Sequence, residues 1–177
     1  MLERLRLLLP PPADPTEPGA PDGWAEVEAA LGTGLPGDFK AFTELYGSGK
    51  VDDFLYLFNP FAQGQDSNLL FEKDRVLAAY AETRAKFPER LPLPPFPEPG
   101  GVLPLGRTDN GDELYWVTQG PPDDWWLALL ESRAAHQEVH RMPVTGFLAA
   151  LAANELATEI LPDDVAHRPS HQFAPFD

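Results

Sequence analysis

The sequence predicts an α+β fold: a single domain in which a mixed or mainly antiparallel sheet is flanked by about four helices. Three observations lead to this prediction. Apolar residues recur at helical spacing in the first third of the chain, a hairpin signal lies at Asn110-Gly111, and further strand-like runs follow it before a last apolar helix. With 177 residues, 43% of them hydrophobic, the chain is long enough to close one core.

Two helices are predicted near the start of this domain. Trp24, Val27 and Leu31 share one helical face, and Gly32 supplies a left-handed stop. A second helix follows Pro36, since proline is favoured at the first turn, and it ends before Gly47. Its apolar positions are Phe39, Phe42, Leu45 and Tyr46.

The rest of the domain alternates between strands and helices. A buried strand is expected over 54–58, and a long helix over 67–87, ended by Pro88. Strands over 102–108 and 113–118 flank the Asn-Gly pair, which is typical of a tight hairpin. Two more strands are expected over 125–130 and 138–142, and Thr145 can cap a closing helix.

Proline sets the predicted domain boundaries. The chain has 21 prolines, and they concentrate before residue 22 and between residues 88 and 104. Proline removes a backbone donor and fixes φ, so both stretches should be irregular. We expect a proline-rich leader over 1–21, a domain over 22–161 with a rigid connector over 88–99, and a C-terminal tail over 162–177. Residues 90–97 also resemble a polyproline ligand, but a spacer explains them better.

Charge and composition exclude several classes of protein. The formal net charge is −15, which disfavours nucleic acid and anionic membranes as partners and favours a basic protein. Cysteine is absent, and the longest N-terminal apolar run is too short for a signal peptide or a membrane span. We therefore expect a cytoplasmic protein.

No catalytic site is predicted. Lys50 follows a Gly-Ser-Gly segment, but the spacing of a phosphate loop is wrong. Asp109 to Glu113 resembles part of a calcium loop, but Leu114 stands where that loop needs glycine, and a hairpin turn explains the same residues. His136 and His140 have the spacing of a metal pair, but no third ligand is evident nearby apart from Glu138, which is expected to face the other side of a strand, so solvent-facing histidines are expected. His167 and His171 lie in the predicted tail, so no structural role is expected for them. No cofactor or metal is expected.

Acidic residues at turns and strand ends are the predicted partner contacts. Trp126 is expected to assist as an apolar anchor, because one of the two adjacent tryptophans 125 and 126 should face away from the core. The acidic positions are Asp52, Asp53, Asp109, Asp112, Asp123 and Asp124.

Several short motifs, taken in order, resemble the SUKH superfamily, which includes Smi/Knr-type cell-wall assembly regulators of fungi and many bacterial proteins. The first motifs are the helix from Trp24 to Gly32, the Leu35-Pro36-x-Asp38-Phe39 segment, and Leu45-Tyr46-Gly47-x-Gly49. Leu105-Gly106, Gly111-Asp112-x-Leu114-Tyr115-Trp116, the Trp125 strand and Phe147-Leu148 follow. The resemblance covers about residues 24–156.

The resemblance implies an α+β fold and a non-enzymatic role. Bacterial members are immunity proteins that bind a toxin domain, often a nuclease, and block its active site. We therefore expect a protein that neutralises a basic toxin. The alternative is a regulatory scaffold that recruits a cellular protein, as the fungal members suggest. Proline-rich segments and the long helix over 67–87 depart from the family pattern.

Overall fold

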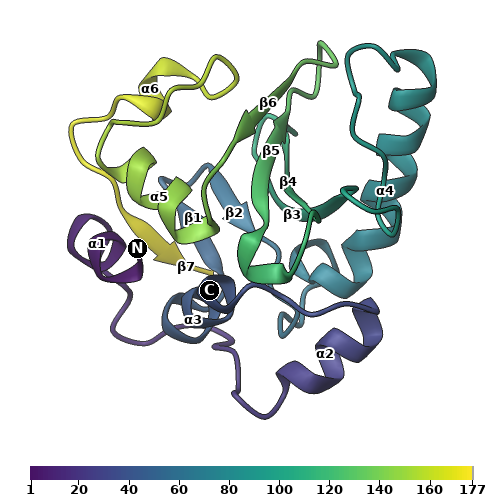
Figure 1. Ribbon diagram of the computed structural model, residues 1–177. Coiled ribbons are helices and arrows are strands. Elements are labelled where there is room, and N and C mark those ends of the chain that lie inside the picture. The colour runs from purple at the N-terminus through teal and green to yellow at the C-terminus, as the bar shows by residue number, and fades with distance from the viewer. Residues whose placement is uncertain (177) are drawn as a thin grey trace.

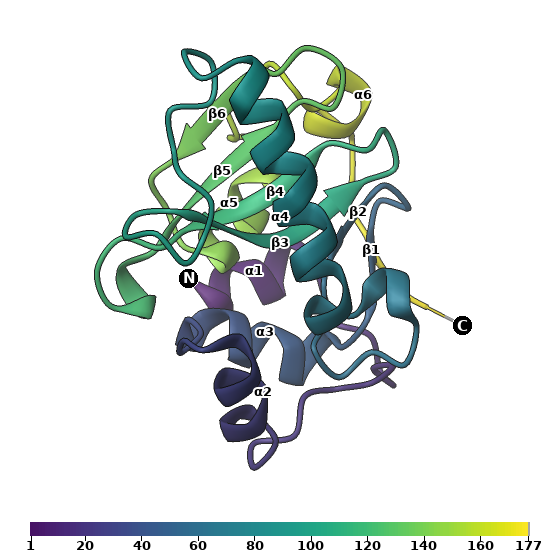
Figure 2. The ribbon, with the colours of Figure 1, turned by 90° about the vertical axis from the view of Figure 1, so that its right-hand side faces the viewer.

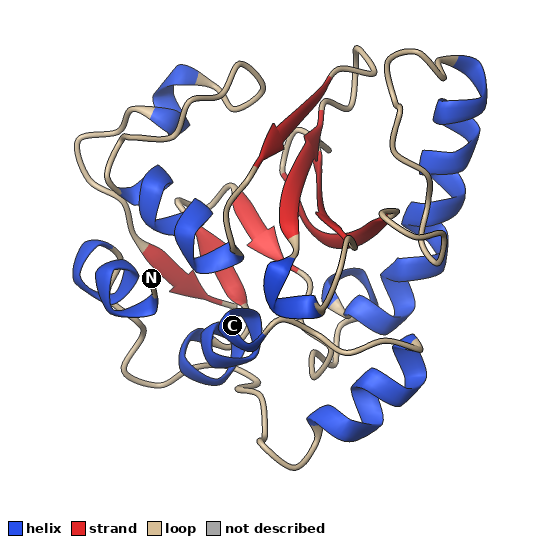
Figure 3. Cartoon of the chain, viewed as in Figure 1, coloured by secondary structure: helices blue, strands red, loops and turns tan. Residues whose placement is uncertain are grey.

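The computed structural model describes residues 1–176, in which six α-helices surround a seven-stranded sheet (Figures 1 and 3). The α-helices are α1 (Leu2–Leu8), α2 (Trp24–Leu31), α3 (Gly37–Tyr46), α4 (Leu69–Lys86), α5 (Val144–Ala152) and α6 (Asp163–Ala166). The strands are β1 (Gly49–Val51), β2 (Leu55–Leu57), β3 (Val102–Thr108), β4 (Glu113–Val117), β5 (Trp126–Leu130), β6 (Gln137–His140) and β7 (Phe173–Pro175). Two 3-10 turns, η1 (Gln65–Ser67) and η2 (Pro122–Asp124), complete the list.

The sheet confirms the predicted α+β class. Its strand order is β6-β5-β4-β3-β2-β1-β7, and every neighbouring pair is antiparallel. The hairpin predicted at Asn110-Gly111 joins β3 to β4, where Thr108 N donates to Asp112 O and Gly111 N donates to Thr108 O. Gly111 has φ of +87°, a left-handed conformation that glycine adopts without a Cβ clash.

Helices cover both faces of the sheet. Helix α4 lies across one face, and α1, α3 and α5 lie on the other (Figure 2). Adjacent residues of β4 contact helices on opposite faces of the sheet. Tyr115 packs edge-on against Tyr80 of α4, with 5.3 Å between the ring centroids, and Trp116 packs against Phe39 of α3, with 4.8 Å between the centroids. Successive strand residues point to opposite faces, so both faces of β4 are buried, as the fully buried Trp116 shows.

The N-terminal segment is part of the domain, which corrects the leader expected over 1–21. Leu5 and Leu9 are fully buried, and Tyr46 Oη donates to the carbonyl of Leu9 at 2.6 Å. Further along, Ser48 N donates to Thr16 O at 2.7 Å. The prolines end α1 and keep residues 10–20 irregular as expected, but this irregular chain packs against the core.

The C-terminal segment also differs from the expected tail over 162–177. Strand β7 pairs with β1, so residues far apart in the sequence share the sheet edge. His171 was expected to have no structural role, yet its side chain is 1% exposed and its Nδ1 lies 2.6 Å from Asp52 Oδ2. The described part of this segment, up to residue 176, therefore completes the fold.

The connector over 88–99 has neither helix nor strand, in line with its proline content. It is still anchored, because Leu91 is fully buried and Tyr80 Oη donates to Leu93 O at 2.8 Å. The four helices predicted within 22–161 correspond to α2, α3, α4 and α5. Thr145 does not cap α5; its hydroxyl donates to Asp38 of α3. No helix among residues 1–176 combines the length and the apolar character needed to cross a bilayer.

Candidate functional site

The predicted contact acids lie at opposite ends of the sheet. Asp52, Asp53, Asp109 and Asp112 belong to the β1–β2 and β3–β4 turns, which are neighbours because Asp109 N donates to Phe54 O. Asp123 and Asp124 lie in η2, before β5 and beyond the other end of β4. The structure therefore does not gather these acids into one surface.

Asp52 is not a surface residue, which corrects its predicted role as a partner contact. Its side chain is 0% exposed. Oδ2 pairs with His171 Nδ1, Oδ1 accepts from Gln172 N at 3.0 Å, and Arg168 Nη1 lies 3.6 Å from Oδ1. This carboxylate holds the C-terminal segment against the β1–β2 turn.

Asp112 is also a structural residue and not a partner contact. It is buried, and its Oδ2 accepts from Thr108 Oγ1 at 2.8 Å. Its Oδ1 accepts from Ser132 N at 3.0 Å, which links the β3–β4 turn to the chain after β5. A partner could reach this carboxylate only by unfolding both turns.

The remaining predicted contacts reach solvent to different degrees. Asp53 and Asp124 are exposed, and no hydrogen bond or ion pair occupies either side chain within the described residues. Asp109 is exposed but holds Lys50 Nζ between its two oxygens at 2.8 and 2.9 Å. Asp123 accepts from Gly37 N at 2.7 Å, at the N-terminus of α3. These four carboxylates stay available for long-range attraction of a cation.

Trp126 is half-buried, and its adjacent residue Trp125 is buried. The Arg141 guanidinium lies over the Trp126 ring, 4.9 Å from its centroid. A partner that used this ring as an anchor would first have to displace the arginine.

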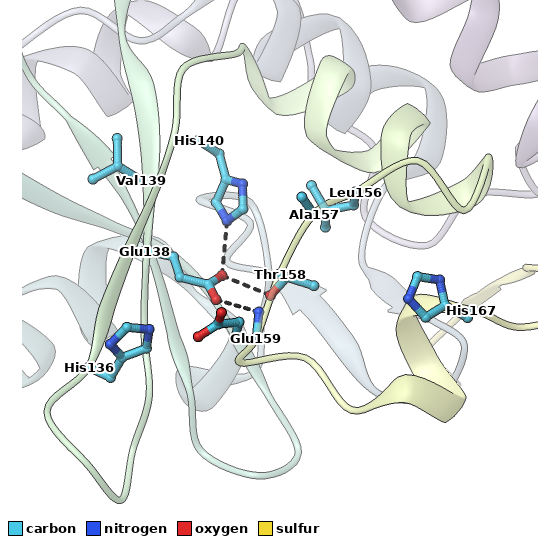
Figure 4. Close-up of a pocket in the computed structure, with 9 residues that line it drawn as sticks. All are labelled: His136, Glu138, Val139, His140, Leu156, Ala157, Thr158, Glu159 and His167. Atoms are coloured by element: carbon cyan, nitrogen blue, oxygen red, sulfur yellow. Dashed lines mark hydrogen bonds and ion pairs between the residues drawn. The ribbon is translucent and has the colours of Figure 1, made fainter.

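A hollow of about 570 Å³ lies beside β6 and is lined by several ionisable side chains (Figure 4). One wall is β6 with the residue before it, and the other is the segment after α5. Val139 lines the hollow although its side chain points to the other side of the strand, so the backbone of β6 forms part of the wall (Figure 4). The lining residues are His136, Glu138, Val139, His140, Leu156, Ala157, Thr158, Glu159 and His167.

Glu138 bridges the two walls of this hollow. Its Oε2 accepts from Thr158 Oγ1 at 2.8 Å, and its Oε1 accepts from the backbone N–H groups of Glu159 and Ile160. Thr158 Oγ1 in turn accepts from Ile160 N at 3.2 Å. The bridge fixes the loop after α5 beside the edge strand and so keeps the hollow open.

His140 corrects the expectation of two solvent-facing histidines. His136 is exposed, but His140 is 6% exposed and packs edge-on against Phe147 at 5.1 Å. Its Nε2 lies 3.3 Å from Glu138 Oε2, because residues two apart in a strand share a face. The expectation that Glu138 faces the other side of the strand is therefore wrong.

Burial lowers the pKa of His140, and the nearby Glu138 carboxylate opposes that shift only in part. The imidazole is therefore neutral at pH 7. The Thr158 hydroxyl, which also lines the hollow, donates to Glu138 and not to His140. His140 and Glu138 could offer two metal ligands, but no group of three ligating side chains comes together among residues 1–176.

A second charged cluster joins α4 to the sheet. Arg107 of β3 donates to Glu72 Oε2 at 3.0 Å and to Glu113 Oε1 at 2.9 Å, and Arg75 also pairs with Glu72. Burial raises the pKa of Glu113 despite its contact with Arg107. Burial opposes ionisation of Glu72 as well, but the two arginines outweigh it and lower the pKa of that group. The paired charges make this cluster a structural link.

Sequence reasoning missed three acidic residues in the segment between Thr158 and His167, called the acidic rim of the hollow from here on. Glu159, Asp163 and Asp164 are exposed, and they lie in the segment that joins Thr158 to His167, two lining residues. The Asp163-Asp164 pair is visible in the sequence, but nothing local predicts that the chain around it lines a hollow with β6.

Comparisons with protein-family models, with curated proteins and with solved structures found no match for this chain. The resemblance to the SUKH superfamily therefore stays a prediction from the sequence motifs.

Proposed function

We propose that this chain is a non-enzymatic, protein-binding domain whose partner presents a basic surface. The hollow beside β6 carries the proposal. Its lining includes the carboxylates Glu138 and Glu159, the apolar side chains of Leu156 and Ala157, and no lysine or arginine. A cationic group that entered would meet negative charge without a competing cation, while the apolar side chains supply area to bury.

The net charge of −15 supports the same proposal at longer range. Exposed carboxylates at both ends of the sheet, among them Asp53 and Asp124, raise the encounter rate with a cation and repel phosphates. We therefore favour a protein partner over nucleic acid or an anionic membrane.

Together with the resemblance to bacterial immunity proteins, these features favour a specific role. We propose that the protein neutralises a toxin domain, of nuclease type, by covering its basic active-site groove in the cytoplasm. Carboxylates on this chain would take positions that substrate phosphates otherwise occupy. Inhibition by occlusion needs no catalytic residue, and the neutral, buried His140 supplies none.

Co-expression with the toxin domain encoded beside the gene tests the proposal. Wild-type protein should restore growth and bind the purified toxin, with an association rate that falls steeply with salt. Failure to bind or protect, with a folded toxin of proven activity, would refute the immunity role. A gene without a toxin neighbour would favour the alternative, a regulatory scaffold.

Two variants that remove the same amount of charge locate the contact. Glu159→Gln, Asp163→Asn and Asp164→Asn neutralise the rim of the hollow, and Asp53→Asn, Asp109→Asn and Asp124→Asn neutralise predicted turn acids. We expect about tenfold weaker toxin binding for the first set and about threefold or less for the second. Equal losses of toxin affinity would show that binding depends on the overall electrostatic field of the protein and not on the hollow.

A further inference from the structure

The two edge strands of the sheet are protected to different degrees. Strand β7 has three residues, includes Pro175, and is tied down at its end, where Phe176 N donates to Ser48 O and Phe176 O accepts from Thr16 Oγ1. Short strands and prolines are common protections of a sheet edge. Strand β6 has no proline, and Val139 at its middle is 46% exposed.

The strand register shows which backbone groups of β6 point outward. Glu131 N donates to His136 O, so these two residues form a hydrogen-bonded pair. Pairs alternate along an antiparallel ladder, and the β5–β6 register is continuous, so Glu138 and His140 bond to β5. The N–H and C=O groups of Gln137 and Val139 therefore face the free edge, and no described residue bonds to them across that edge.

The hollow adjoins this free edge, and its charge indicates what would pair there. Glu159 lines it without an ion-pair partner, and Asp163 and Asp164 are exposed in the chain that joins the lining residues Glu159 and His167. Two arginines near the strand are engaged elsewhere: Arg141 lies over Trp126, and Arg90 Nη1 donates to Ala134 O at 3.1 Å.

We propose that an extended segment of a partner protein, carrying lysine or arginine at alternate positions, pairs with the free edge of β6 as an eighth strand. Backbone hydrogen bonds to Val139 and Gln137 would hold the segment, and its basic side chains would reach the acidic rim of the hollow. This inference rests on the proposed function and specifies how the partner binds. A second copy of this chain is a poorer occupant, because each copy carries a charge of −15.

A peptide of defined composition tests the pairing without knowledge of the natural partner. The probe is an acetylated, amidated octapeptide of alternating lysine and threonine, followed by amide hydrogen exchange of the full chain. At a peptide concentration that occupies nine-tenths of the protein molecules, hydrogen exchange of the Val139 amide should slow about tenfold, while the exchange rates of exposed loop amides should not change. The same peptide N-methylated at alternate residues, and a glutamate–threonine peptide, should give no protection.

One substitution isolates the backbone contact. Val139→Pro removes the outward N–H and leaves the ladder to β5 intact, and Val139→Ala keeps the N–H while removing the same exposed side chain. The proline variant should lose peptide binding at least tenfold, and the alanine variant should bind within about twofold of wild type. Circular dichroism and an unchanged denaturation midpoint check that both variants fold.

The outcomes separate this inference from the proposed function. If the toxin binds wild type and Val139→Pro equally well, or if the peptide gives no protection at Val139 at millimolar concentration, strand addition is refuted. Loss of toxin binding in Val139→Pro alone supports it. If wild type binds no basic toxin while the peptide still pairs with β6, the immunity role fails and the docking edge remains.

Discussion

Replacement of Asp52 by asparagine should be among the most damaging single changes of a polar residue in this protein. The side chain is 0% exposed, and both oxygens accept hydrogen bonds, one from His171 and one from the backbone of Gln172. Asparagine keeps one acceptor oxygen, but its NH₂ group replaces the other oxygen and then faces a hydrogen-bond donor, either His171 or the backbone N–H of Gln172. Loss of a charge-assisted hydrogen bond costs about 1.5–3 kcal/mol, and an unpaired buried donor about 1–3 kcal/mol, so we expect about 3–5 kcal/mol in total.

Asp53→Asn is the matched control. Asp52 and Asp53 are adjacent in the same turn and have φ of +57° and +56°, a conformation that asparagine tolerates. Asp53 is exposed, so its replacement should change the free energy of unfolding by about 0.5 kcal/mol or less. The difference in the free energy of unfolding between the two variants therefore reports the contribution of the buried carboxylate and not an effect of the backbone conformation.

Urea denaturation followed by tryptophan fluorescence measures both variants, and the midpoints can be compared if the m-values agree. Limited proteolysis adds a local readout, since Asp52→Asn should expose the chain after residue 162 to cleavage before the core unfolds. A difference below about 1 kcal/mol between the two variants would mean that the Asp52–His171 contact does not hold the C-terminal segment.

Three further substitutions test the core, the N-terminal helix and the buried histidine. Trp116→Ala should lower the free energy of unfolding by about 3–5 kcal/mol because the ring is 0% exposed, and Trp126→Ala should lower it clearly less because that ring is only half-buried. Equal denaturation midpoints for the two variants would contradict this packing. Tyr46→Phe removes the hydrogen bond to Leu9 O, so it should lower the free energy of unfolding by about 0.5–1.5 kcal/mol and speed proteolysis of α1. An unchanged rate of cleavage would mean that this bond does not anchor the helix. Burial lowers the pKa of His140 in the folded state, so the unfolded chain binds a proton at this residue at a higher pH than the folded chain does. The free energy of unfolding should therefore fall as the pH drops below about 6.5, by at most about 1.4 kcal/mol per pH unit. His140→Gln should remove this part of the pH dependence between pH 7.5 and 5.5, and a variant as pH-sensitive as wild type would show that another group titrates.

Sequence reasoning succeeded where local signals and the final fold agree. The β3–β4 hairpin follows from Asn110-Gly111, and α4 begins and ends within two residues of its predicted limits, Asn68 at its N-cap and Pro88 after its end. These elements depend on turn chemistry and apolar spacing that lie within a short window of sequence.

Short elements that depend on distant partners were missed. Helix α1 has Leu2, Leu5 and Leu9 at helical spacing, a signal that the following prolines obscured. Strands β1 and β7 have three residues each and pair with each other across most of the chain, and β1 also pairs with β2. No local pattern of that length identifies a strand.

The candidate site was the least predictable part of the molecule. Asp52 and Asp53 look alike in the sequence, and only the return of the C-terminal segment makes one a buried anchor and leaves the other exposed. Likewise, the hollow beside β6 forms because Glu138 binds a loop about twenty residues further along the chain. Charge predicted the character of the surface, and the fold decided which carboxylates remain free.

Isothermal titration of the purified protein with the basic toxin domain encoded beside its gene tests the central claim most directly. We expect saturable binding that inactivates the toxin, weakens as salt increases, and is reduced more by neutralising the rim of the hollow than by neutralising the turn acids. Absence of binding at low salt, with both proteins folded, would contradict the claim that this acidic domain is built to cover a basic partner.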